Sequence, residues 1–177
     1  MKRLLSTLAF IVIYFAAIAD NGVEIVQDWG TLRGDHICSE GKKQRVVIFI
    51  AGSGPTDRNG NQPSMQTYSY RQLADSLFAY GISSILYDKR GIAASQYNNP
   101  SDLLSDCHFY HYVNDASMLV DYASQLGYDE IALAGHSEGS LIALLVAQQN
   151  DKVDRVISLA GAGRSIDKIV MLQLMGQ

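Results

Sequence analysis

The sequence of 177 residues predicts an α/β fold, in which a mostly parallel sheet is covered by helices on both faces. Short apolar runs rich in β-branched residues alternate with segments whose apolar residues recur at helical spacing. Such alternation is typical of βαβ units in a parallel sheet. The length suits one domain, and 47% of the residues are hydrophobic, which is enough to build a core.

Five segments carry the strand pattern. Residues 23–37 are polar and interrupted by glycines, which predicts an antiparallel hairpin that leads into the sheet. Residues 45–50 are almost continuously apolar, as expected of a parallel strand buried on both faces. Residues 82–87, 131–134 and 153–159 have the same character. The sequence therefore predicts four parallel strands and one hairpin.

Helical periods lie between these strands. Glycines at positions 81 and 127 are placed to end the first two helices, and residues 166–174 have the character of a further helix. The longest irregular stretch, residues 96–106, is a candidate cover for a site. Two apolar stripes and a third, mostly apolar face are Tyr70, Leu73, Ala74 and Leu77; Val113, Ala116, Val120 and Ala123; and Leu141, Leu144, Leu145 and Gln148.

The first nineteen residues have the pattern of a signal peptide. Lys2 and Arg3 precede an apolar run that ends in Ala17-Ile18-Ala19, with small residues where a signal peptidase reads. We predict cleavage before Asp20, one folded domain over residues 20–177, and export to the periplasm or the exterior. The run is short for a membrane span of about 20 residues, so membrane contact is expected only if the segment stays uncleaved.

Charge and cysteine content exclude some classes of function. The 14 basic and 18 acidic residues give a net charge of −4 and form no basic face, so a nucleic-acid partner is not expected. Cys38 and Cys107 would meet an oxidising compartment after export, but sequence spacing leaves their pairing open. Neither a CxxC motif nor a zinc-ligand spacing is present, so we expect no metal site.

The sequence GHSEG at residues 135–139 joins a predicted strand to a predicted helix. A G-x-S-x-G motif in this context forms a strained turn that exposes its serine, so Ser137 is the candidate nucleophile. Side chains at Gly135 and Gly139 would collide with nearby backbone in such a turn. The backbone N–H of Glu138, at the helix N-terminus, is a candidate donor to an oxyanion.

A second glycine-rich loop, residues 51–61, follows the first buried strand. Its Ser53 N–H is the candidate second donor to the oxyanion. The loop lacks the G-K-[ST] ending of a phosphate loop, and Asp57 stands where a dinucleotide fingerprint needs its third glycine. A purely structural turn remains an alternative. Thr56, Asp57 and Arg58 favour an internal brace over substrate contact, so no substrate-binding residue is assigned.

Four blocks together resemble the α/β-hydrolase superfamily, and within it the exported branch of serine aminopeptidases and related acyl esterases. The blocks are GSGPTDR at 52–58, YDKRG at 87–91, GHSEG at 135–139 and AGAGR at 160–164. This resemblance implies a nucleophile at Ser137 and an oxyanion hole formed by the N–H groups of Ser53 and Glu138. It also implies cleavage of an ester, thioester or peptide bond in a small-molecule or peptide acyl substrate, without a cofactor.

The remaining catalytic residues are not evident. In this superfamily an acid and then a histidine follow the nucleophile. No histidine follows Ser137, and the aspartates that do are Asp151, Asp154 and Asp167. His136 is expected to face away from the site, since neighbouring positions on a strand alternate, and to serve in packing. His36 also precedes the serine, and His108 and His111 favour surface or loop positions, although one of these two could substitute as the base.

These observations favour the N-terminal portion of a serine hydrolase whose fold is incomplete at the C-terminus. One alternative is a non-catalytic remnant or binding module of the same fold, with the open sheet edge as its docking surface. Another is a Rossmann-like nucleotide-binding domain.

Overall fold

The computed structural model describes residues 20–39, 44–105 and 108–176. The strands are β1 (Asp20–Val26), β2 (Thr31–Ile37), β3 (Arg45–Ile50), β4 (Ser83–Tyr87), β5 (Glu130–His136) and β6 (Arg155–Leu159). The helices are α1 (Ser69–Ala79), α2 (Asp102–Ser105), α3 (Phe109–Gln125), α4 (Glu138–Gln149) and α5 (Ile166–Met175).

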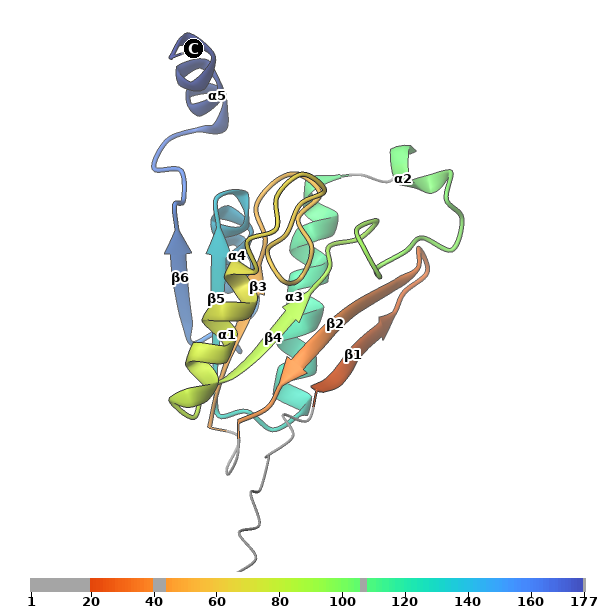
Figure 1. Ribbon diagram of the computed structural model, residues 1–177, viewed down its shortest axis with the longest axis vertical. Helices are drawn as coiled ribbons and strands as arrows, with labels where there is room; N and C mark the ends of the chain where they lie inside the picture. Colours follow the sequence, from red (N-terminus) through yellow and green to blue (C-terminus); the bar gives the residue numbers. More distant parts are fainter. Residues whose placement is uncertain (1–19, 40–43, 106–107, 177) are drawn as a thin grey trace, which may run out of the picture.

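All six strands form one sheet, in the order β1-β2-β4-β3-β5-β6 (Figure 1). The predicted hairpin is confirmed, because β1 pairs antiparallel with β2, and β2 pairs antiparallel with β4. The other four strands are parallel, as the sequence predicted. β6 begins two residues later than predicted, at Arg155.

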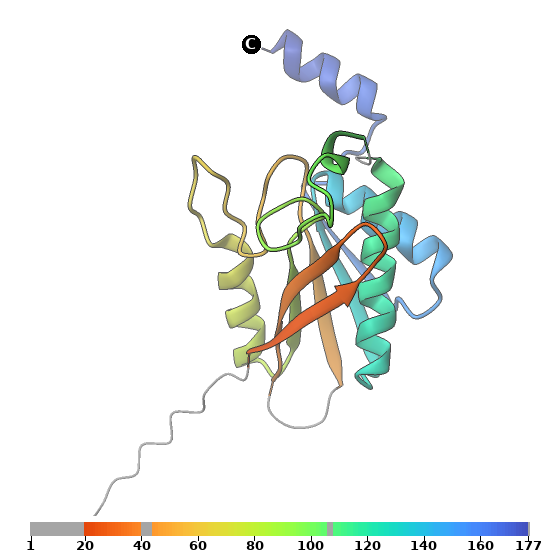
Figure 2. The ribbon, with the colours of Figure 1, turned by 90° about the vertical axis from the view of Figure 1, so that its right-hand side faces the viewer.

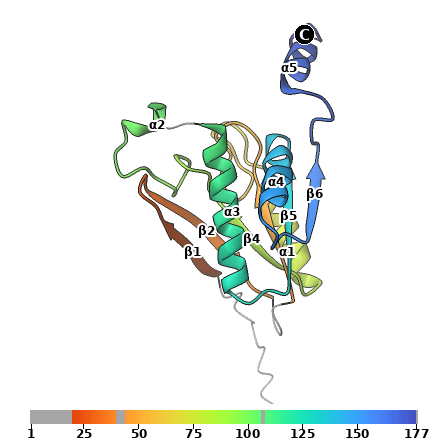
Figure 3. The ribbon, with the colours of Figure 1, turned by 180° about the vertical axis from the view of Figure 1, so that it is seen from behind.

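Helices cover both faces of the sheet, as predicted. In the side view α1 lies on one face and α3 on the other (Figure 2), and the view from behind shows α4 beside α3 (Figure 3). Under α1, Tyr70 and Ala74 pack with Phe49 and Leu86. The larger core lies under α3 and α4. Gly81 and Gly127 follow the ends of α1 and α3 with φ of 72° and 85°, which confirms their role as helix terminators.

The chain reverses its direction of winding at β3. From β3 it crosses through α1 to β4 on one side, and from β4 it crosses back through α3 to β5 on the other side. The loops that follow β3 and β5 therefore leave the sheet side by side. A crevice at the carboxyl ends of such strands is the usual ligand site in open α/β sheets.

The predicted inward face of α4 is wrong. Leu141 and Leu144 are exposed, and the buried residues are Gly139, Ser140, Ile142, Ala143 and Val146. Because α4 is apolar on nearly all sides, the spacing of its leucines could not select a face. Close approach selects it instead: a Cβ at Gly139 would lie 2.2 Å from the carbonyl oxygen of Ile50 in β3.

Two further predicted segments, residues 96–105 and 166–174, lie at the periphery of the sheet. The stretch 96–105 contains α2 and lies beside the β1–β2 turn, where Tyr97 bridges to Gly30 and stacks near Trp29. The predicted last helix is present as α5, and it extends away from the sheet (Figures 1 and 2). Its Met171, Leu172 and Leu174 are exposed.

Some predictions fall outside the described residues. The signal peptide at residues 1–19 is one, so export and cleavage before Asp20 stay predictions. Cys107 is another, and Cys38 has a free thiol. Among the described residues, no helix is long and apolar enough to cross a bilayer.

A polar cluster lies at the end of the sheet opposite the β3 and β5 carboxyl ends. His36 Nε2 and Tyr128 Oη share a hydrogen bond of 2.6 Å, and both residues are buried. Tyr128 Oη also donates to Cys38 Sγ at 3.9 Å. Burial raises the pKa of Tyr128 to about 12, and the hydrogen bond to Cys38 adds to the increase. His36 is therefore a structural residue.

We predict that Tyr128 makes the fold sensitive to alkali. The folded pKa exceeds the unfolded value of about 10, so this contribution to stability is complete below pH 10 and is lost between about pH 10 and 12. The difference in free energy of unfolding between wild type and Tyr128→Phe should fall by about 2 kcal/mol between about pH 9 and 12. Urea denaturation measures it, with the exposed Tyr80→Phe as control; a constant difference for Tyr128→Phe would contradict the prediction.

Candidate active site

Ser137 occupies the turn between β5 and α4, in a backbone conformation unusual for a residue with a side chain. Its φ is 53° and its ψ is −116°, which is strained for any residue other than glycine. Ser137 N–H donates to Leu159 O at 2.8 Å, and Ser140 Oγ donates to Gly135 O at 2.6 Å. These bonds to β6 and to the end of β5 hold the strained turn in place.

The two glycines of the turn are required by sterics, as the sequence predicted. A Cβ on Gly135 would lie 2.1 Å from Gly139 O, and a Cβ on Gly139 would lie 2.2 Å from Ile50 O. Both neighbours are backbone atoms that cannot rotate away. The turn therefore packs directly against β3 and presents Ser137 as an exposed residue before the first turn of α4.

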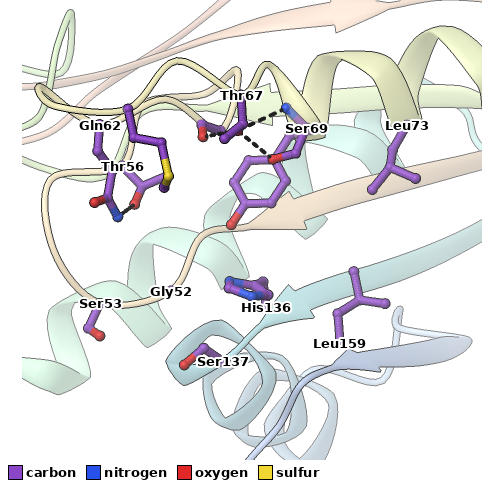
Figure 4. Close-up of a pocket in the computed structure, with 13 residues that line it drawn as sticks. Gly52, Ser53, Thr56, Gln62, Thr67, Ser69, Leu73, His136, Ser137 and Leu159 are labelled. Atoms are coloured by element: carbon purple, nitrogen blue, oxygen red, sulfur yellow. Dashed lines mark hydrogen bonds between the residues drawn. The ribbon is translucent and has the colours of Figure 1, made fainter.

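The loop after β3 lies against Ser137. A Cβ on Gly52 would approach Ser137 Cβ to 3.2 Å, so the backbone of this loop is within van der Waals reach of the serine. Ser53 and Ser137 line the same cavity (Figure 4). Glu138 follows Ser137 directly, as the first residue of α4. The first N–H groups of a helix have no partner within it. The three residues singled out in the sequence thus come together at one place.

The cavity has a volume of about 460 Å³. One wall comes from the segment between β3 and α1 and from the first turns of α1, and the other comes from the ends of β5 and β6 (Figure 4). Its lining combines apolar and uncharged polar side chains with one histidine. The lining residues are Gly52, Ser53, Thr56, Gly60, Gln62, Met65, Thr67, Ser69, Tyr70, Leu73, His136, Ser137 and Leu159.

His136 also lines this cavity, so the expectation that it faces away is wrong. His136 follows the strand alternation of Ala132 and Ala134, which face α1 and Tyr70. Ser137 departs from this alternation, with its φ of 53°, so it need not face away from His136. The His136 ring packs near Tyr70, with 6.4 Å between ring centroids, in agreement with the expected packing role. Burial raises the pKa of Tyr70, and a backbone hydrogen bond with Gly52 opposes this increase.

The other titratable candidates lie away from the cavity. His108 and His111 contact each other at the start of α3, with ring centroids 5.3 Å apart. Asp154 accepts from Ile131 N–H at 2.8 Å, at the amino end of β5, and Asp151 and Asp167 are exposed. Among the described residues, none of these five lines the cavity, and no group of three or more potential ligands is placed to hold a metal ion.

The expected brace in the loop after β3 is present. Arg58 Nη2 donates to buried Asp88 at 2.8 Å, Arg58 N–H donates to the same carboxylate at 2.7 Å, and the guanidinium also contacts Asp35. Asp57 accepts from Asn61 N–H at 2.8 Å. Thr56 differs from these two, since it lines the cavity and accepts from Gln62 Nε2 at 2.9 Å.

No sequence motif indicated the wall of the cavity that residues 60–73 build. The expected core stripe includes Tyr70 and Leu73. Tyr70 packs in the core and also lines the cavity, whereas Leu73 is exposed at the cavity. The loop 96–105, a candidate cover, contributes no lining residue. The feature that could have indicated this wall is the helix that follows the glycine-rich loop along the chain.

Comparisons with known proteins agree with this geometry. A family model described as serine aminopeptidase, S33, matches residues 64–176, which include the 135–139 turn. No curated protein sequence gives a significant match.

Solved structures of α/β hydrolases have the same fold. GrgF from Penicillium sp. sh18 superposes with a TM-score of 0.63 at 22% identity, over 88% of this chain and 52% of that one. A dienelactone hydrolase from Anabaena variabilis gives 0.61 at 20% identity, over 80% and 63%. An α/β serine hydrolase without lid from Xanthomonas campestris gives 0.62 at 20% identity, over 82% and 63%.

These identities are low, so the structural matches establish the fold alone. The chain spans about half to under two thirds of the length of these three structures. The family model covers more than half of the chain. The chain belongs to the serine aminopeptidase S33 family of the α/β-hydrolase superfamily.

Proposed function

We propose that this chain supplies the nucleophile and the oxyanion hole of a serine hydrolase, which cleaves an ester, thioester or peptide bond through an acyl-enzyme on Ser137. The observation that carries the proposal is the strained turn. Ser137, at φ 53°, is exposed at the N-terminus of α4 and lies against the glycine-rich loop after β3. Strain of this kind persists only where the surrounding structure holds it, and it is frequent at active sites.

The chemistry follows from the neighbours of Ser137. Its Oγ forms a bond to the carbonyl carbon of the substrate while the hydroxyl proton passes to a general base, and the carbonyl oxygen takes on negative charge. The N–H groups of Ser53 and Glu138 would donate to this oxygen, and the N-terminus of α4 favours the charge. The tetrahedral intermediate then expels the alcohol, thiol or amine, which takes a proton, and water hydrolyses the acyl-enzyme.

The lining of the cavity favours an uncharged acyl group. Met65, Leu73 and Leu159 offer apolar contact, and Thr56 and Gln62 offer neutral hydrogen-bonding groups. Among the described lining residues, none is an aspartate, glutamate, lysine or arginine. A charged acyl group would lose hydration here without gaining a counter-charge.

Deprotonation of Ser137 needs a base. Among the described residues no histidine is hydrogen-bonded to the Ser137 hydroxyl, and His136 packs on Tyr70 instead. This observation favours a second candidate, a non-catalytic module that binds acyl compounds in the same cavity. The two candidates differ in whether Ser137 forms a covalent bond.

The test supplies the base from solution. The purified chain is treated with an alkyl fluorophosphonate at neutral pH, with and without added imidazole, and its intact mass is followed over time. We expect one phosphonyl adduct, formed at least about tenfold faster with imidazole, since general base catalysis contributes about 10²–10⁴-fold.

Two variants serve as controls. Ser137→Ala should abolish the adduct, and Ser76→Ala, an exposed serine of α1, should leave its rate unchanged. An adduct that persists in Ser137→Ala would refute the assignment of the nucleophile. No adduct even with imidazole, together with reversible binding of the matching alkyl ester, would favour the binding module.

A further inference from the structure

Lys89 is a buried cation that contacts the loop after β3. It lies two residues beyond the end of β4 and is only 4% exposed. Its Nζ donates to the carbonyl oxygen of Gly52 and to that of Gly54, the latter at 3.0 Å. These carbonyls lie on either side of Ser53, so one ammonium group holds both ends of the segment that carries the Ser53 N–H.

The bond to Gly52 acts on the same peptide unit that contains the Ser53 N–H. The carbonyl oxygen of Gly52 and the amide hydrogen of Ser53 are trans across one planar peptide. Holding the oxygen toward Lys89 therefore directs the N–H to the opposite side. A cation at the carbonyl also polarises the amide, because hydrogen bonds in a chain strengthen one another.

Glycines on both sides of Ser53 leave the backbone around this peptide conformationally free. It lies between two glycines, and Gly54 has a φ of 83°, a conformation that glycine adopts freely. Asp88, the neighbour of Lys89, holds the later part of the loop through Arg58. Two consecutive residues after β4 thus hold two parts of one loop, and Lys89 is the one whose side chain donates to the carbonyls of Gly52 and Gly54.

We infer that Lys89 is a positioning residue, which orients and polarises the Gly52–Ser53 peptide so that the Ser53 N–H is fixed as an oxyanion donor. This inference rests on the proposed function of Ser53 and Ser137. Lys89 itself is directed at backbone carbonyls and is not among the residues that line the cavity.

The experiment compares Lys89→Met with wild type in phosphonylation of Ser137 at a fixed imidazole concentration. The rate constant at saturating fluorophosphonate should fall about 10–100-fold, somewhat less than the loss of a complete oxyanion donor. The concentration for half-saturation should not change, because the cavity that binds the alkyl group is intact. The control is Lys152→Met, which removes an exposed lysine paired with Asp121 and should match wild type.

A second measurement does not depend on reactivity. In ¹³C NMR spectra the carbonyl resonance of Gly52 should move upfield in Lys89→Met, since it loses its hydrogen bond to a cation. If this variant does not fold, Lys89→Gln, which keeps an N–H donor without the charge, takes its place, and a smaller decrease in rate is expected.

An unchanged saturating rate constant, or an unchanged Gly52 resonance, would overturn the inference. Failure of the proposed function has a different signature, since wild type itself would then form no adduct at Ser137. In that case the Gly52 resonance by itself would still show whether Lys89 holds the Gly52 carbonyl.

Discussion

Arg90→Met should destabilise the fold by about 3–5 kcal/mol, because it removes the guanidinium that donates to both oxygens of a buried carboxylate. Arg90 Nε and Nη2 donate to the two oxygens of Asp115 at 2.8 and 2.7 Å, and the side chains are 6% and 1% exposed. The guanidinium also lies 4.5 Å from the centre of the Trp29 ring. The pair joins the loop after β4 to α3, so its loss affects two layers of the structure.

Urea denaturation of Arg90→Met measures this loss. The double variant Arg90→Met/Asp115→Leu should recover much of the stability, since replacing both charges by apolar groups removes the uncompensated charge. Asp121→Ala is the matched control, because its pair with Lys152 is exposed and is expected to contribute less than about 1 kcal/mol. A loss for Arg90→Met as small as that of Asp121→Ala would show that the buried pair is not a major determinant of stability.

Gly135→Ala should cost at least about 3 kcal/mol, at the upper end of the range for overpacking. The added Cβ would lie 2.1 Å from Gly139 O, 2.4 Å from Gly139 C and 2.6 Å from Ser140 N. All three are backbone atoms, so relief requires α4 to move away from β5. Such a shift would also displace Ser137 and reduce its phosphonylation.

Gly163→Ala provides the comparison for this prediction. A Cβ at Gly163 has no neighbour within 4 Å, so its effect should stay within about 0.5 kcal/mol. Midpoints of urea denaturation for the two alanine variants give the difference directly. Equal midpoints would mean that the 135–139 turn is looser than the close approach of these atoms indicates.

Much of the fold was predictable because its signals are local. Residues 45–50 are apolar without alternation, which occurs when both faces of a strand are buried. β3 indeed lies in the interior of the sheet, between β4 and β5. Gly81 and Gly127 mark helix ends because only glycine adopts their positive φ at low cost. The 135–139 turn was predictable because its signal is also local: Gly135 and Gly139, where a side chain would collide with backbone, lie within five residues.

The remaining errors concern features that depend on tertiary contacts. The buried face of α4 follows from the contact of Gly139 with β3, which no periodicity within an almost wholly apolar helix reports. His136 and Ser137 line the same cavity because Ser137, with its φ of 53°, no longer follows strand alternation, and the sequence does not report that backbone angle. Lys89 carries no sequence signal for its burial, because its partners are backbone carbonyls 37 and 35 residues away.

The central claim is that Ser137 is a nucleophile that faces an oxyanion hole built by the N–H groups of Ser53 and Glu138. A crystal structure of the phosphonylated chain tests it most directly. The account predicts phosphorus bonded to Ser137 Oγ, with the phosphonyl oxygen about 2.7–3.1 Å from the backbone nitrogens of both residues. Phosphorus on another residue, or a phosphonyl oxygen directed to solvent away from both nitrogens, would contradict it.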